Sequence, residues 1–132
     1  MKQLLTVYLL SFLFSCSEKR SSDAEDCYRL WSGVKPPKEI NVLNGSYWQS
    51  AHFTKEYILF LEIKANDEWV KQFIKENKLI PTGGNWWQPD DTPEWFKPTQ
   101  SSKQWKLPDQ QSDSRYFEDT IAGKLFLYEI QL

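Results

Sequence analysis

The alternation of apolar and polar residues predicts its clearest strand at residues 57–64, YILFLEIK. Four apolar side chains fall on one face of this stretch, and Ile58 and Phe60 fall on the other. Successive side chains of a strand point to opposite faces of a sheet. Apolar residues on both faces therefore predict a central strand that is covered on both sides over at least its first half.

The stretch DEWVKQFIKENKL has the period of a helix instead. From Trp69, apolar residues recur at positions i, i+1, i+4 and i+5, which places them in one stripe. Residues 66–67, Asn-Asp, can cap the helix, and Pro81 with residues 83–84, Gly-Gly, ends it. The sequence therefore predicts one amphipathic helix here.

The remaining pattern predicts strands on both sides of a long loop. Residues 47–54 have strand composition, and residues 115–119 and 124–131 read as a closing pair of strands around a turn at Gly123. Residues 82–114 are irregular, with a single helical turn expected at Pro93–Phe96. We therefore predict an α+β fold: a small antiparallel sheet of about four strands with one main amphipathic helix packed on one face, in the order strand, strand, helix, long loop, strand, strand.

Composition narrows the class of protein. The chain has 132 residues, enough for one domain, and 16% of them are aromatic, so a few large side chains can build its core. The formal net charge of −2 gives no basic surface for nucleic acid, so no nucleic-acid partner is predicted.

The N-terminal residues predict export. Lys2 precedes an eleven-residue apolar run, 4–14, which is too short to span a bilayer and is typical of a signal peptide. LFSC at residues 13–16 then resembles a bacterial lipobox, although Phe14 is larger than is usual at its position. The resemblance implies cleavage before Cys16 and a lipid on its sulfur. The alternative is an ordinary secretory signal with a chance cysteine.

The lipobox resemblance sets the expected domain organisation. Residues 1–15 are a lipoprotein signal peptide, 16–27 a lipid-anchored flexible tether, and 28–132 a single α+β domain. The predicted location is the bacterial cell envelope, with the protein anchored in the membrane through Cys16. Ser17 after the cysteine favours the outer membrane. With Cys16 lipidated, Cys27 has no disulfide partner and is expected to be a half-buried, small apolar residue.

Local motifs for catalysis or metal binding are weak. His52 is the only histidine, and no neighbouring motif supplies a nucleophile or an orienting acid. Asp90, Asp91 and Glu94 could be a metal site, but Pro93 among them favours the start of a helical turn. We therefore predict no catalytic residue, no metal and no cofactor.

The tryptophan-rich stretch NWWQPDDTPEWF is the one suggestive binding feature. Tryptophan on a loop can stack on a sugar ring, and nearby amides and acids can bond its hydroxyls. The alternative is that the indoles pin a long loop onto the core, and a hybrid places one of Trp86 and Trp87 inward and the other outside. The candidate ligand-binding residues are Asn85, Trp86, Trp87, Gln88, Asp90 and Trp95.

The layout from KPPKEI at residues 35–40 to YFEDTIAGKLFLYE at 116–129 resembles that of small uncharacterised bacterial lipoproteins. The resemblance brings no activity with it. We therefore expect a non-enzymatic binding or envelope-associated module whose partner is a protein, peptide or glycan. The alternatives are an immunity protein against a bacterial toxin and a hydrolase that uses His52.

Overall fold

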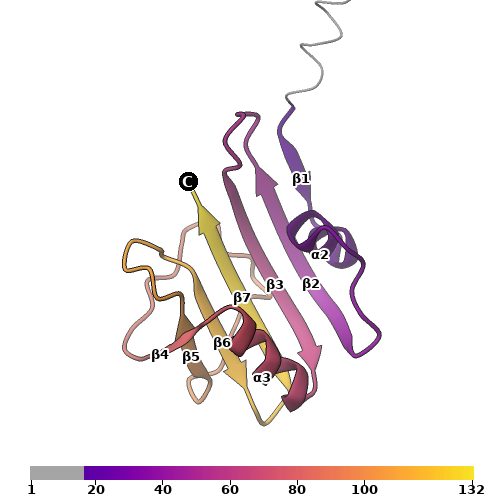
Figure 1. Ribbon diagram of the computed structural model, residues 1–132. Helices are drawn as coiled ribbons and strands as arrows, with labels where there is room; N and C mark the ends of the chain where they lie inside the picture. Colours follow the sequence, from indigo (N-terminus) through magenta and orange to yellow (C-terminus); the bar gives the residue numbers. More distant parts are fainter. Residues whose placement is uncertain (1–16) are drawn as a thin grey trace, which may run out of the picture.

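Seven antiparallel strands form one sheet in the order β1–β2–β3–β7–β6–β5–β4, as the computed structural model shows for residues 17–132 (Figure 1). The described elements, in chain order, are β1 (Lys19–Ser21), α2 (Ala24–Ser32), β2 (Ile40–Gln49), β3 (Tyr57–Ala65), α3 (Asp67–Glu76), β4 (Ile80–Thr82), β5 (Lys103–Lys106), β6 (Arg115–Asp119) and β7 (Lys124–Gln131). The predicted signal peptide and Cys16 lie outside the described residues. Within residues 17–132, no helix is long and apolar enough to cross a membrane.

The predicted four-stranded sheet with one main helix is wrong. The sheet has seven strands, and two short helices accompany it in a different order. Two of the additional strands, β4 and β5, flank the long loop and have only three and four residues. Strands this short have no readable period, and they form because antiparallel pairing with their neighbours satisfies their backbone groups.

The other additional elements, β1 and α2, lie in and just after the segment that we predicted to be a flexible tether. β1 pairs with β2, and α2 begins at Ala24. The Asp23 side chain caps this helix by accepting a 2.9 Å hydrogen bond from the Asp26 backbone N–H, and Gly33 ends it in the left-handed conformation. The folded domain therefore begins near Lys19 instead of at residue 28.

Helix α2 lies very close to β2. Cys27 is fully buried, rather than half-buried as predicted, and its thiol lies 3.3 Å from the Ser21 carbonyl oxygen. Burial raises the pKa of this thiol. A Cβ atom at Gly45 would lie only 2.7 Å from the Cys27 Cβ, so residue 45 must be glycine for the helix to approach the strand.

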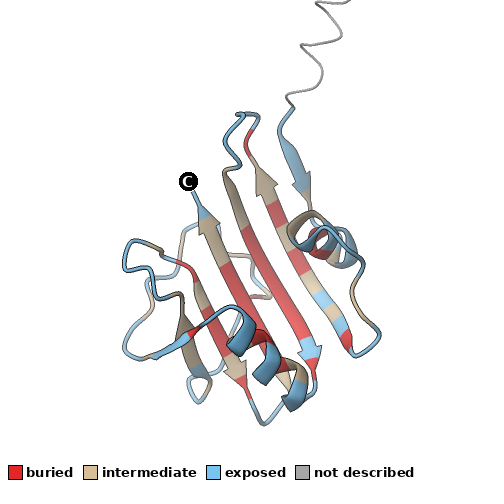
Figure 2. Cartoon of the chain, in the orientation of Figure 1, coloured by how far each residue is buried: buried red, intermediate tan, exposed pale blue. Residues whose placement is uncertain are grey.

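The central strands are buried along most of their length (Figure 2), and an apolar cluster covers each face of the sheet. One face of β3 and β7 meets both helices in a cluster that we call the helix-face core. Its buried members are Cys27, Tyr28, Ile40, Tyr47, Leu59, Leu61, Ile63, Ala65, Val70, Phe73, Leu79, Tyr116, Leu125 and Leu127. Within the described residues 17–132, the seven strands pair into one sheet and an apolar cluster forms on each of its faces.

The opposite face carries an aromatic cluster that we call the loop-face core. Its members lie on β3, β6, β7 and the loop between β4 and β5: Phe60, Phe96, Phe117, Phe126 and Tyr128 are buried, and Ile58, Trp86, Trp95 and Ile130 are partly buried. The loop therefore covers this face of the sheet, as the two helices cover the other face. This explains why β3 has apolar residues on both of its faces.

Candidate functional site

The loop at residues 83–102 connects β4 to β5 and is fixed to the sheet by Phe96. The Phe96 ring is 2% exposed and lies 5.2–5.4 Å, centroid to centroid, from the rings of Phe60 and Phe126. Two successive turns present it: the Thr92 N–H donates to the Pro89 carbonyl at 3.1 Å, and the Phe96 N–H donates to the Pro93 carbonyl at 3.0 Å. The predicted helical turn at Pro93–Phe96 is thus a single hydrogen-bonded turn.

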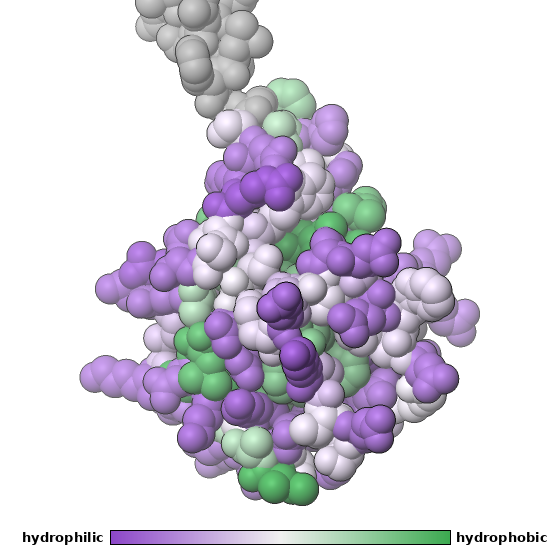
Figure 3. All heavy atoms as spheres, turned by 180° about the vertical axis from the view of Figure 1, so that it is seen from behind, coloured by the Kyte–Doolittle hydropathy of each residue, from purple (hydrophilic) through white to green (hydrophobic). Residues whose placement is uncertain are grey.

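The two adjacent tryptophans face opposite ways. The Trp86 ring lies 5.1 Å from that of Phe117 and 5.6 Å from that of Tyr128, so it packs on the sheet. Trp87 is 87% exposed. This is the hybrid arrangement considered above, in which one of the two tryptophans packs inward and the other is exposed to solvent. Seen from this side, the surface is mainly hydrophilic, with separate small apolar patches (Figure 3).

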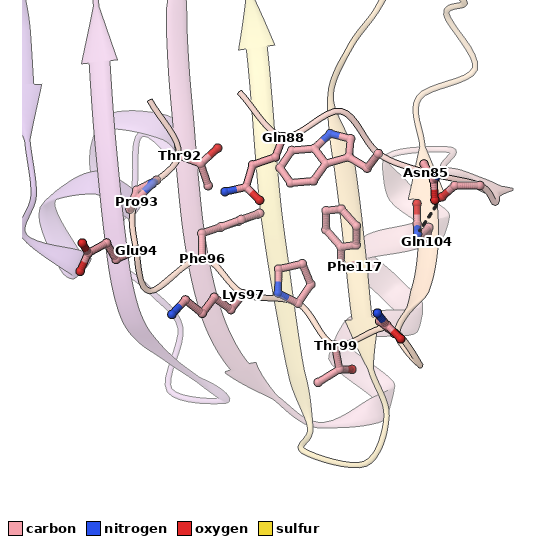
Figure 4. Close-up of a pocket in the computed structure, with 14 residues that line it drawn as sticks. Asn85, Gln88, Thr92, Pro93, Glu94, Phe96, Lys97, Thr99, Gln104 and Phe117 are labelled. Carbon is pink, nitrogen blue, oxygen red and sulfur yellow. Dashed lines mark hydrogen bonds between the residues drawn. The ribbon is translucent and has the colours of Figure 1, made fainter. Parts of the chain in front are cut away.

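An open cavity of about 1180 Å³ lies between the loop and the sheet, and we call it the Trp86 groove. Its lining residues are Gly84, Asn85, Trp86, Gln88, Thr92, Pro93, Glu94, Phe96, Lys97, Pro98, Thr99, Gln100, Gln104 and Phe117. Figure 4 shows these side chains arranged along the loop and over β6. Phe96 and Phe117 are buried, so Trp86 is the aromatic side chain of this set that a ligand can reach. Most of the reachable lining is polar and uncharged.

A second cavity, of about 570 Å³, lies on the other side of Trp86, and we call it the Arg115 pocket. Its lining residues are Asn85, Trp86, Trp87, Pro89, Ser112, Asp113, Arg115 and Tyr128. Burial, together with the negative charges of Asp91 and Asp113, raises the pKa of Tyr128 to about 12. The phenol therefore stays protonated and can donate a hydrogen bond at neutral pH.

Arg115 and Gln104 connect the two cavities. The Arg115 Nη1 donates a 2.9 Å hydrogen bond to the Gln104 Oε1, which orients the amide in the wall of the Trp86 groove. The Gln104 Nε2 then lies 3.4 Å from the Gly84 carbonyl oxygen. The Arg115 Nε is buried without a hydrogen-bond partner in the described structure. Neither residue was among the predicted site residues, because they lie on separate strands and no local motif marks them.

The predicted ligand-binding residues divide into three groups. Asn85 and Trp86 line both cavities, Gln88 lines the Trp86 groove, and Trp87 lines the Arg115 pocket. Trp95 packs against Phe96 with ring centroids 6.0 Å apart and lines neither cavity. Asp90 is exposed in the turn and also lines neither. The loop thus brings together four of the six candidates.

The residues considered for catalysis and metal binding lie in two different loops: His52 between β2 and β3, and Asp90, Asp91 and Glu94 between β4 and β5. His52 is exposed in the loop between β2 and β3, and its backbone N–H lies 3.4 Å from the Ser50 hydroxyl. Within residues 17–132, no group of three or more His, Cys, Asp or Glu side chains is placed to hold a metal ion.

A side-chain hydrogen-bond network lies on the helix face, around Glu129. Its carboxylate accepts bonds from the Trp31 indole at 2.6 Å, the Tyr57 hydroxyl at 3.0 Å and the Tyr116 hydroxyl at 2.6 Å. Burial and then the Glu129 charge raise the pKa of both tyrosines above their ordinary range. The network links α2 to strands β3, β6 and β7, and we interpret its role as structural.

Comparison with protein-family models, with curated proteins and with solved structures finds no match to this chain.

Proposed function

We propose that this chain is a binding module of the bacterial envelope, anchored by a lipid on Cys16, and that its Trp86 groove binds a glycan. The observation that carries the proposal is the lining of the groove: an accessible indole among neutral amides and hydroxyls. The anchor rests on the resemblance of LFSC at residues 13–16 to a lipobox. The proposed role is binding without catalysis.

The polar lining favours a sugar over a charged peptide. Six lining side chains are neutral hydrogen-bonding groups: Asn85, Gln88, Thr92, Thr99, Gln100 and Gln104. Each amide can donate and accept, which matches the hydroxyls and acetamido groups of a glycan. The two charged lining residues, Glu94 and Lys97, have opposite signs and leave no net charge to select an ionic ligand. The Trp86 ring supplies the apolar surface on which a pyranose can lie.

Calorimetric titration with soluble glycan strands released from bacterial cell walls tests the groove. The protein is the segment 17–132, which contains the seven strands and both apolar clusters. Gln100→Ala removes an exposed lining amide, and it should weaken binding roughly threefold to tenfold, because a hydrogen bond contributes about 0.5–1.5 kcal/mol. Gln110→Ala removes an amide that is also exposed but lies outside the groove, and it is the matched control. Equal affinities for the two variants, or no heat with the wild type, would refute glycan binding in this groove.

Metabolic labelling with palmitate tests the anchor separately. The wild-type chain should incorporate the label and Cys16→Ala should not. Label that persists in the variant would show that Cys16 is not the lipidated residue.

A further inference from the structure

The end of the sheet where β1 begins carries an exposed apolar tip. The loop 50–56 joins β2 to β3, and the Phe53 side chain in it is 96% exposed. Leu132, 76% exposed, lies at the same end, because Gln131 pairs with Tyr57. Full exposure of a phenylalanine costs hydrophobic free energy that a partner surface can recover.

The chain enters the sheet beside this loop. Lys19 pairs with Gln49, the last residue of β2, so the start of β1 and the loop 50–56 share one end of the molecule (Figure 1). Cys16 precedes Lys19 by three residues, and a segment of that length spans at most about 10–11 Å. A lipid on Cys16 would therefore hold the loop close to the bilayer surface.

We propose that the loop 50–56 docks on the phospholipid surface and places Phe53 among the headgroups. The proposal rests on the lipid anchor proposed above and adds an orientation to it: the sheet stands with this end on the membrane. Aromatic side chains are favoured at the level of the headgroups.

Charge around the tip agrees with an anionic lipid surface. Lys19, Arg20 and Lys55 are all exposed at this end. Arg20 pairs with Glu18, and the Lys55 ammonium lies over the Tyr57 ring, 5.6 Å from its centroid. These three basic residues, set against Glu18 and the partly buried Glu56, leave this end with a net charge of +1. Basic residues near a surface of acidic lipids are attracted to it.

The orientation leaves the Trp86 groove open. The groove is lined by the loop 83–102 together with Gln104 of β5 and Phe117 of β6, and none of residues 50–56 lines it. A protein whose loop 50–56 contacts the membrane can therefore still bind a ligand in the Trp86 groove.

The opposite end of the sheet offers a matched control. Ile121, in the turn between β6 and β7, is 88% exposed, nearly as much as Phe53. The proposal assigns it no membrane contact.

An environment-sensitive dye on a single cysteine tests the docking. Phe53→Cys and Ile121→Cys are each labelled in the lipidated full chain and reconstituted into vesicles of phosphatidylethanolamine and phosphatidylglycerol in equal parts. Cys27 is fully buried and Cys16 carries the lipid, so neither should react. The dye at residue 53 should shift its emission to shorter wavelength and the dye at 121 should not. Equally aqueous emission from both positions would overturn the proposal.

The same vesicles separate a failure of docking from a failure of the anchor. If mass spectrometry shows Cys16 unmodified, the anchor is refuted, and the segment 17–132, without a dye, is mixed with the vesicles to test docking alone. There Phe53→Ser should weaken partitioning roughly tenfold and Ile121→Ser should leave it unchanged. Equal partitioning of these two variants, or a dimer of the segment 17–132 that Phe53→Ser dissociates, would overturn the proposal.

Discussion

Replacing Phe96 by alanine tests whether this side chain fixes the loop 83–102 on the sheet. The ring is 2% exposed and lies within 6.1 Å, centroid to centroid, of the rings of Phe60, Phe117, Phe126 and Trp86. Truncating a buried phenylalanine to alanine costs about 3–5 kcal/mol, because the apolar transfer free energy is lost and a cavity remains. The loop-face core therefore depends strongly on a residue that lies outside every strand.

Urea unfolding of residues 17–132, followed by far-ultraviolet circular dichroism, measures this cost. With an m-value of about 1.5 kcal/mol/M, the Phe96→Ala midpoint should fall by roughly 2–3 M. Trp87→Ala is the matched control in the same loop, and its free energy of unfolding should change by less than about 0.5 kcal/mol, because the indole is 87% exposed.

Two results would refute the conclusion that Phe96 stabilises the core and Trp87 does not. The first is a loss of less than about 1 kcal/mol for Phe96→Ala with an unchanged m-value, which would mean that the ring does not support the native sheet. The second is a Trp87→Ala loss as large as that of Phe96→Ala, which would mean that Trp87 is also part of the core.

Three further predictions concern the rest of the domain. Gly45→Ala should lower the free energy of unfolding by about 1–3 kcal/mol, because the new Cβ meets the Cys27 Cβ, whereas Gly83→Ala, with nothing within 4 Å, should be close to neutral in thermal unfolding. The free energy of unfolding should fall as the pH rises from about 9 to about 12, because first the Cys27 thiol and then the Tyr128 phenol hold their protons more tightly in the folded chain than in the unfolded one; urea titrations from pH 7 to 12 check it, and a flat profile would contradict it. The Cys27 thiol, buried and with a raised pKa, should react with a thiol reagent only after denaturation, so prompt reaction of the native segment 17–132 at neutral pH would contradict its burial.

The strongly patterned elements could be predicted from the sequence. The strand predicted at residues 57–64 is β3 (Tyr57–Ala65), and the amphipathic helix is α3, capped by Asn66. This helix ends at Glu76, earlier than Pro81 suggested, because Lys78 takes a left-handed conformation and turns the chain into β4. Pro81 itself is accommodated because β4 is the edge strand of the sheet.

The fold as a whole could not be predicted, because its missing elements depend on partners distant in sequence. β4 and β5 exist through pairing and have no period of their own. α2 did have a local signal, since Asp23 and Gly33 are good capping residues, but the polar start of this segment suggested a tether. Correcting that boundary also bears on the proposed membrane orientation, because a domain that begins at Lys19 would lie close to a lipid on Cys16.

The candidate site could be predicted in part. The concentration of tryptophans in one loop indicates where the site lies. Which of Trp86 and Trp87 packs inward depends on the backbone direction in an irregular loop, where no periodic pattern assigns side chains to a face. Arg115 and Gln104 meet because β5 pairs with β6 in a particular register, so their hydrogen bond is a property of the tertiary structure.

The most direct test of glycan binding is a nuclear magnetic resonance titration of residues 17–132 with soluble cell-wall glycan strands, followed through side-chain N–H signals. The Trp86 indole and the amides of Gln88, Gln100 and Gln104 should shift together and saturate at one affinity, while the Gln110 amide stays in place. No shifts at saturating glycan, or shifts confined to residues outside the Trp86 groove, would contradict the proposed function.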